Sequence, residues 1–162
     1  MKITPYAESG CPVNGQTCDC AADEHPYAIH EEAKHAGTAD TLRFLAAGAR
    51  RALWLETKEN RLSDALPALQ AKIANAKHVI IESDAIMKFW KPSLFLIVLD
   101  PGNPDFKSSA RENLSLADGF VYRSPFAPAG LGIAVAQKPQ FLQTFGSPLP
   151  LELRQFLSGS IS

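Results

Sequence analysis

The residues best suited to metal chemistry lie in one stretch near the start of the chain, at Cys11, Cys18 and Cys20. Cysteine thiolates and histidine imidazoles are the ligands that zinc and iron–sulfur clusters prefer. The surrounding loop, at about residues 7–25, is rich in Gly, Asn and Asp and can wrap an ion. Three cysteines and one histidine complete a tetrahedral site. His25 is the nearest fourth ligand in sequence, and His30 fits equally well. The pattern predicts a zinc or iron–sulfur site.

Two other interpretations of the cysteine loop stand beside the metal site. The spacing C-x6-C-x-C differs from the usual C-x2-C of zinc sites, and a small polar loop also tolerates cysteines that bind nothing. A redox pair of Cys18 and Cys20 is disfavoured, because cysteines separated by one residue close a strained ring.

Composition and charge exclude several classes of function. The chain has 162 residues, of which 46% are hydrophobic and 20% charged, with a net charge of −1. This length suits a single domain spanning residues 1–162. A near-neutral chain with scattered basic residues predicts no nucleic-acid partner. The longest apolar runs, "LFLIVL" and "HVII", are too short to cross a membrane, and no secretion signal precedes them. We therefore expect a cytoplasmic protein without membrane partners.

Strand-like and helix-like stretches alternate along the chain. The expected strands are 2–6, 50–57, 77–83, 94–100, 119–123 and 140–145. The expected helices are 27–35, 39–49, 62–76, 105–117 and 149–157. The runs at 77–83 and 94–100 are continuously apolar, as in strands buried on both faces. This alternation predicts an α/β domain of three layers, with a mostly parallel sheet flanked by helices.

Acidic residues end two of the apolar strands. Ligands of parallel α/β sheets collect beyond the carboxyl ends of the strands, where Glu82 and Asp100 are expected. A carboxylate delivered by a buried strand can bind Mg²⁺ or orient a water molecule on the ion, which makes Glu82 the candidate catalytic residue. Asp84 is an alternative to Glu82, or it caps the turn that follows. Asp100 can contact a ligand, or it belongs to a turn before a helix.

The stretches "ADTLRFLAAGARRALWL" and "AKHVIIESDAI" resemble the middle of the molybdopterin-guanine dinucleotide biosynthesis protein B family, which are small P-loop nucleotide-binding proteins. The matching positions are Asp40 and Thr41, which open a helix, the Ala-Gly-Ala at 47–49, and Ile81-Glu82-Ser83, which end an apolar strand. The resemblance covers about residues 36–100. It implies GTP or ATP binding with Mg²⁺, with Glu82 assisting the ion and Asp40 and Thr41 near the phosphates.

The chain departs from this family at the element that grips phosphate. Members begin with a strand, a G-x-x-x-x-G-K-[ST] loop and a helix, and this sequence contains no such motif. If residues 2–6 correspond to the second strand of the family, about 30 residues have no counterpart here. The expected fold is thus P-loop-NTPase-like but incomplete at the N-terminus. Mg²⁺ with nucleotide is expected only if a phosphate loop lies upstream, and NTPase activity is not expected of this form.

The absent strand also affects which binding partners we expect. In the family it lies beside the strand that ends in Glu82, so its loss leaves an open sheet edge. We expect an upstream start, closure of 77–83 against 94–100, or a homodimer or partner protein that covers the edge. The sequence therefore predicts a nucleotide-binding accessory protein of molybdenum-cofactor biosynthesis. The alternative is a non-enzymatic metal-binding or protein-interaction domain on a degenerate P-loop scaffold.

Overall fold

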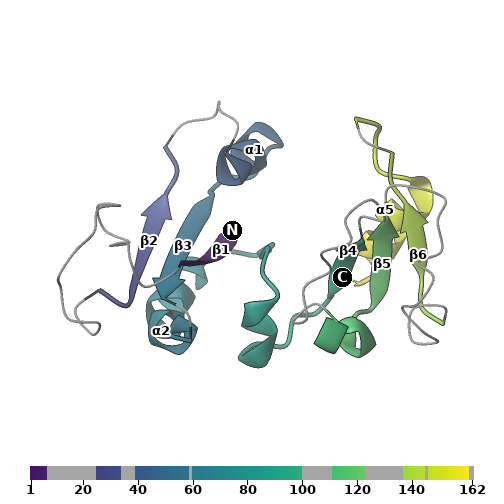
Figure 1. Ribbon diagram of the computed structural model, residues 1–162. Helices are drawn as coiled ribbons and strands as arrows, with labels where there is room; N and C mark the ends of the chain where they lie inside the picture. Colours follow the sequence, from purple (N-terminus) through teal and green to yellow (C-terminus); the bar gives the residue numbers. More distant parts are fainter. Residues whose placement is uncertain are drawn as a thin grey trace. The chain divides into compact units, whose positions relative to one another are not determined.

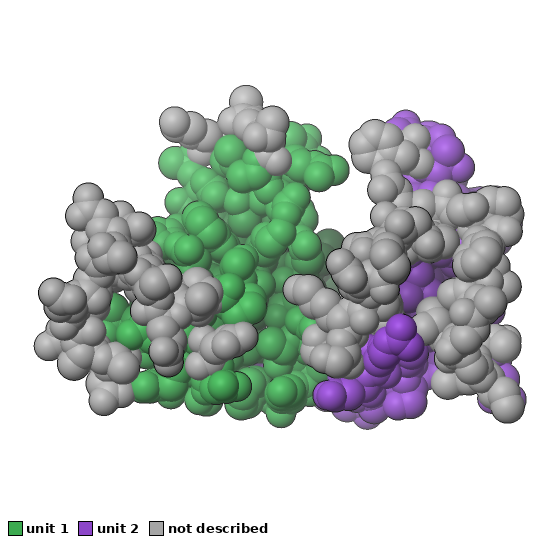
Figure 2. All heavy atoms as spheres, in the orientation of Figure 1, with its two compact units in different colours: residues 1–89 green, residues 90–162 purple. Residues whose placement is uncertain are grey.

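The computed structural model describes residues 1–6, 25–33, 39–58, 60–99, 111–122, 137–144 and 146–160 (Figure 1). These residues form two compact units, residues 1–89 and residues 90–162, which Figure 2 colours separately. Each unit is described by itself below.

The first unit is built on a three-stranded sheet, called sheet A, in the order β1-β3-β2. Its strands are β1 (Lys2–Tyr6), β2 (Tyr27–Glu31) and β3 (Leu53–Lys58). The central strand β3 pairs parallel with β1 and antiparallel with β2. Its residues alternate between a buried face, with Leu53, Leu55 and Thr57, and a half-buried face, with Trp54 and Glu56. This alternation follows from the two-residue period of a strand and gives sheet A one core face and one polar face.

Two helices belong to the first unit, α1 (Asp40–Ala46) and α2 (Leu62–Ile73). Helix α2 packs on β2 and β3 and buries its apolar stripe, Leu62, Ala65 and Leu69. Helix α1 ends at Ala46, before the predicted end at residue 49, and Gly48 follows it with φ of 97°. Glycine adopts this left-handed conformation without steric cost. The helical spacing of apolar residues thus correctly predicted that both stretches form helices.

The stretch predicted as a buried strand at 77–83 is different in the structure. Only Glu82 forms a bridge, parallel to β1 and opposite Lys2. Val79 and Ile80 are exposed, with 40% and 81% of their surface accessible. The prediction that this strand is buried on both faces is therefore wrong. The chain then enters a 3-10 helix, η1 (Ala85–Lys88), and Asp84 is at its N-cap position without a side-chain capping hydrogen bond.

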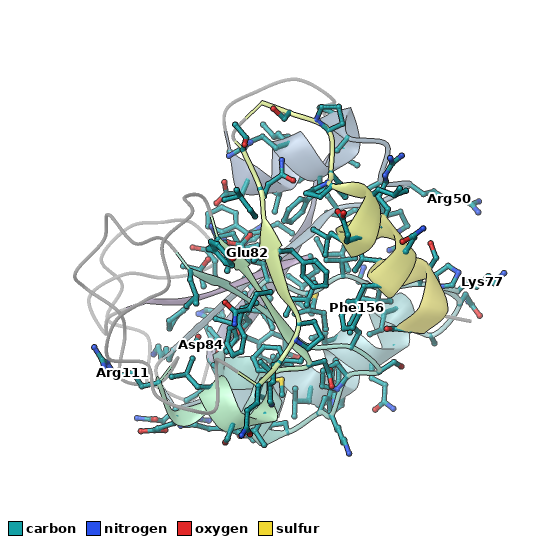
Figure 3. All side chains as sticks on the ribbon, turned by 90° about the vertical axis from the view of Figure 1, so that its right-hand side faces the viewer. Arg50, Lys77, Glu82, Asp84, Arg111 and Phe156 are labelled. Atoms are coloured by element: carbon teal, nitrogen blue, oxygen red, sulfur yellow. The ribbon has the colours of Figure 1, made fainter. Side chains whose placement is uncertain are left out.

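The second unit contains a three-stranded parallel sheet, called sheet B, in the order β4-β5-β6. Its elements are β4 (Leu96–Leu99), η2 (Leu114–Leu116), β5 (Gly119–Tyr122), β6 (Gln140–Leu142) and α5 (Leu151–Ser160). Phe120, on the central strand, is fully buried in an apolar cluster that also contains Ile97 and Leu99. Phe156, labelled in Figure 3, extends from α5, and its ring centroid lies 5.2 Å from that of Phe141 on β6.

The structure confirms an α/β architecture with parallel strand pairing and flanking helices. The described strands form two small sheets instead of one, and sheet A is mixed. The helix predicted at 27–35 is wrong, since Tyr27–Glu31 is strand β2. Pairing decides this segment: Ile29 lies opposite Leu55 of β3, on the core face of the sheet. Tertiary pairing has overridden a local sequence that is compatible with a helix.

Candidate functional site

Three charged side chains from distant parts of the sequence lie together, and we call them the Lys2 cluster. They are Lys2, Asp40 and Glu82. The ammonium Nζ of Lys2 donates a hydrogen bond to Oδ2 of Asp40 and lies 3.5 Å from Oε1 of Glu82. Arg43 adds a further positive charge, with Nη1 at 3.5 Å from Oδ1 of Asp40. Two of the carboxylates that the sequence singles out thus converge on one cation.

Backbone pairing places the members of the cluster. Lys2 begins β1, and Glu82 lies opposite it in a parallel bridge, so both side chains are on the same face of the sheet. This is the polar face, because Lys2 is opposite Trp54 of β3. Asp40 is the first residue of α1, where a carboxylate interacts favourably with the helix dipole. The cluster therefore depends on a strand start, a bridge and a helix start.

The position of Glu82 corrects one expectation. The sequence predicts Glu82 beyond the carboxyl end of a sheet strand. In the structure Glu82 is level with the first residue of β1, and β1 continues to Tyr6. The carboxylate consequently lies on the polar face of sheet A instead of beyond the carboxyl end of its strands. Figure 3 labels Glu82 and, two residues further along the chain, Asp84.

The charges of the Lys2 cluster support one another. The hydrogen bond to Asp40 raises the pKa of Lys2, with Coulomb attraction from Glu82 adding to it and partial desolvation opposing it. The same hydrogen bond, with the charge of Lys2, lowers the pKa of Asp40. Lys2 is therefore protonated and Asp40 ionised at neutral pH. The side chains of Lys2, Asp40 and Glu82 are 29%, 38% and 54% exposed, so solvent screens their attraction and the site is open to ligands.

A second polar group lies on the same face of sheet A. Trp54 donates its indole N–H to Oγ1 of Thr4 at 3.2 Å. His30 Nε2 lies 3.3 Å from Oε2 of Glu56, and the His30 and Trp54 ring centroids are 5.8 Å apart. The sequence missed this group, because a helix is expected over 27–35 and His30 is considered there only as an alternative to His25 for the cysteine site. A strand assignment for β2 would have placed His30 on the Trp54 face.

Thr41, predicted near the phosphates, lies in a buried position one residue after Asp40. Its hydroxyl donates a hydrogen bond of 2.6 Å to Oε1 of Glu32. The neighbouring Glu31 accepts two hydrogen bonds from the guanidinium of Arg51, at 2.7 and 2.8 Å, which lowers the pKa of Glu31. These two pairs join the end of β2 to α1 and to the residues before β3.

Several predicted site residues lie outside the described residues. They are Cys11, Cys18, Cys20 and Asp100. His25 is described and is half-buried, two residues before β2. Within the ranges given above for the structure, no group of three or more His, Cys, Asp or Glu side chains is arranged to hold a metal ion. The zinc or iron–sulfur site of the cysteine loop therefore stays a prediction.

Comparison with known proteins gives no match: no family model, no curated protein and no solved structure is similar to the chain. Among the described helices, none has the length and apolar composition needed to cross a membrane.

Proposed function

We propose that the chain is a nucleotide-binding accessory protein of molybdopterin-guanine dinucleotide biosynthesis, with GTP or ATP as the nucleotide. One observation carries the proposal. Asp40 and Glu82, the carboxylates that the family resemblance assigns to phosphate and Mg²⁺, are far apart in sequence, yet both contact the ammonium of Lys2. Two carboxylates that contact the same ammonium group are also suitable ligands for the Mg²⁺ ion of a metal–nucleotide complex.

Asp40 and Glu82 are residues of the type that binds Mg²⁺. Proteins usually bind this ion through one or two carboxylates, with water and substrate phosphates as the other ligands. Asp40 and Glu82 would hold the ion, which when bound neutralises phosphate charge. Lys2 then has its ammonium available to donate to a phosphate oxygen. Arg43, 64% exposed in its side chain, offers a second donor next to Asp40.

The reaction expected of this chain is binding without hydrolysis. The sequence has no G-x-x-x-x-G-K-[ST] loop, whose backbone amides and lysine supply most of the grip on phosphate. Lys2 supplies a positive charge but not a cradle of amides. The protein would hold and present a nucleotide, and an upstream phosphate loop or a partner would complete the grip.

The test is a fluorescence titration of the native protein, purified from its source cells, with mant-GTP and mant-ATP. We expect binding that requires Mg²⁺ and disappears in EDTA. Asp40→Asn and Glu82→Gln should each weaken it by at least about tenfold. Glu152→Gln is the matched control, because Glu152 is an exposed carboxylate in the first turn of α5. Binding that is unchanged in EDTA, or equal in all three variants, would contradict the proposal.

A non-enzymatic protein-interaction domain is the second candidate. It is favoured by the exposed apolar side chains next to β1, Val79 and Ile80. Monomeric proteins rarely leave such residues together at a sheet edge, where unpaired backbone groups invite another strand. Nucleotide binding separates the two candidates, since an interaction domain has no need of Mg²⁺ or of Asp40.

A further inference from the structure

The segment His78–Glu82 forms an outer edge of sheet A in the described residues. Three hydrogen bonds attach it to β1: the amino group of Met1 donates to Ile80 O at 2.7 Å, Glu82 N to Met1 O at 2.9 Å, and Ile3 N to Glu82 O at 3.2 Å. All of the backbone groups that this segment uses belong to Ile80 and Glu82. The segment is thus hydrogen-bonded on the side that faces β1.

The other side of the segment presents backbone groups and apolar side chains. Successive residues of a strand direct their N–H and C=O groups to opposite sides, so those of Val79 and Ile81 are directed away from β1. Neither residue takes part in a backbone–backbone hydrogen bond within the described part of the chain. Ile80 is 81% exposed, which is the largest exposure of any described large hydrophobic residue.

The sequence of this edge is complementary to itself. In an antiparallel pair of two copies with Ile80 opposite Ile80, Val79 lies opposite Ile81 and His78 lies opposite Glu82. The two Val79–Ile81 pairs exchange the backbone bonds that are directed away from β1. The two His78–Glu82 pairs place an imidazole next to a carboxylate, and an imidazole N–H donates to a carboxylate in either charge state.

We infer that this edge is a homodimer interface in which two copies of the chain pair antiparallel through residues 78–82. The dimer joins two copies of sheet A into one continuous sheet, with a two-fold axis at Ile80. A second copy is the occupant because the register is self-complementary: apolar residues meet at the centre, and each end pairs a potential cation with an anion. The interface uses Glu82, which the nucleotide-binding proposal also uses. The test therefore leaves Asp40 and Glu82 unchanged, so that loss of the dimer and loss of nucleotide binding are measured separately.

The experiment is sedimentation velocity of the full chain, with a mass of 17.6 kDa per copy, over a range of concentrations. We expect the wild-type chain to sediment as a dimer. Ile80→Lys places two ammonium groups at the axis and should raise the dimer dissociation constant by about tenfold or more. Ile81→Pro should do the same. It removes an N–H that is directed away from β1, so it leaves the hydrogen bonds of the unit itself intact.

Two further variants make the test specific. His78→Glu should weaken the dimer, because it opposes Glu82 with a like charge, whereas His78→Lys should retain it. Val98→Lys is the matched control: Val98 is 68% exposed on β4, which is one of the two outer strands of sheet B among the described residues, and its replacement should leave the dimer intact. A wild-type chain that is monomeric throughout, or a dimer that only Val98→Lys dissociates, would overturn the inference. A stable complex in which another protein covers residues 78–82 would also overturn it.

Discussion

Sheets A and B have the same number of strands and distribute their polar groups in different ways. In sheet A, one face is core and the other carries ionic and hydrogen-bonding side chains, including the Lys2 cluster and the His30–Glu56 pair. In sheet B, the central strand β5 begins with buried Gly119 and Phe120, and the neighbouring strand contributes Ile97 and Leu99 to the same apolar cluster.

The two sheets therefore contribute different properties: the apolar cluster of sheet B contributes stability, and the polar face of sheet A contributes groups that can bind a ligand. An apolar cluster gains free energy in proportion to the area it removes from water, and it offers no group that binds a charged ligand. Half-exposed ion pairs contribute little to stability, because water screens them, yet they remain available to a ligand. We therefore expect substitutions in sheet B to change folding, and substitutions on the polar face of sheet A to change binding.

The largest effect should come from Phe120→Ala in sheet B. Phe120 is 0% exposed, and its loss should lower the free energy of unfolding of the second unit by about 3–5 kcal/mol, since the cavity cannot collapse fully. Denaturant unfolding followed by circular dichroism measures the change. Leu142→Ala is the control, because Leu142 is 40% exposed on the neighbouring strand β6 and should cost much less. Equal losses in the two variants would show that Phe120 is not the centre of this core.

A smaller effect on stability than that of Phe120→Ala should come from Lys2→Met in sheet A, and it should depend on pH. The pKa of Asp40 is lowered from its ordinary 3.8, so its pairing stabilises the fold above about pH 4 and is lost as pH falls through the folded-state value. The pKa of Lys2 is raised from 10.5, so its contribution is present below that pH and is lost above it.

The wild-type chain should therefore be more stable than Lys2→Met between these limits and equal to it in acid. Thermal unfolding at a series of pH values measures the difference. Arg43→Met is the comparison variant, because Arg43 lies further from Asp40 and should give a smaller difference. A difference between wild type and Lys2→Met that persists unchanged after the pH has fallen through the lowered folded-state pKa of Asp40 would contradict the assigned pairing.

The elements that the sequence predicted correctly are those whose local pattern decides the structure. Helix α2 has apolar residues at helical spacing, β4 is an aliphatic run with Ile97 and Val98, and β3 alternates buried and half-buried residues. Segments decided by pairing were not predicted: β2 exists because Ile29 lies opposite Leu55, and Ile80 is exposed because no described strand covers it.

The candidate site was predicted in part for the same reason. Asp40 and Glu82 are at positions where the sequence resembles a known family, so the sequence analysis selected them as candidates. Lys2 carries none, since a lysine at a strand start is common, and only the bridge to Glu82 and the approach of α1 reveal its role. The Thr41–Glu32 hydrogen bond is a contact between neighbouring elements and has no spacing that a motif would record.

The most direct test of the account locates the bound cation. Mn²⁺, which replaces Mg²⁺ and broadens nearby NMR signals, would be added with GTP to the isotopically labelled native protein. The account predicts that broadening is strongest at Lys2, Asp40 and Glu82 and weak in sheet B. Broadening that centres on the His30–Glu56 pair or on β5, with the signals of Asp40 and Glu82 unchanged, would contradict it.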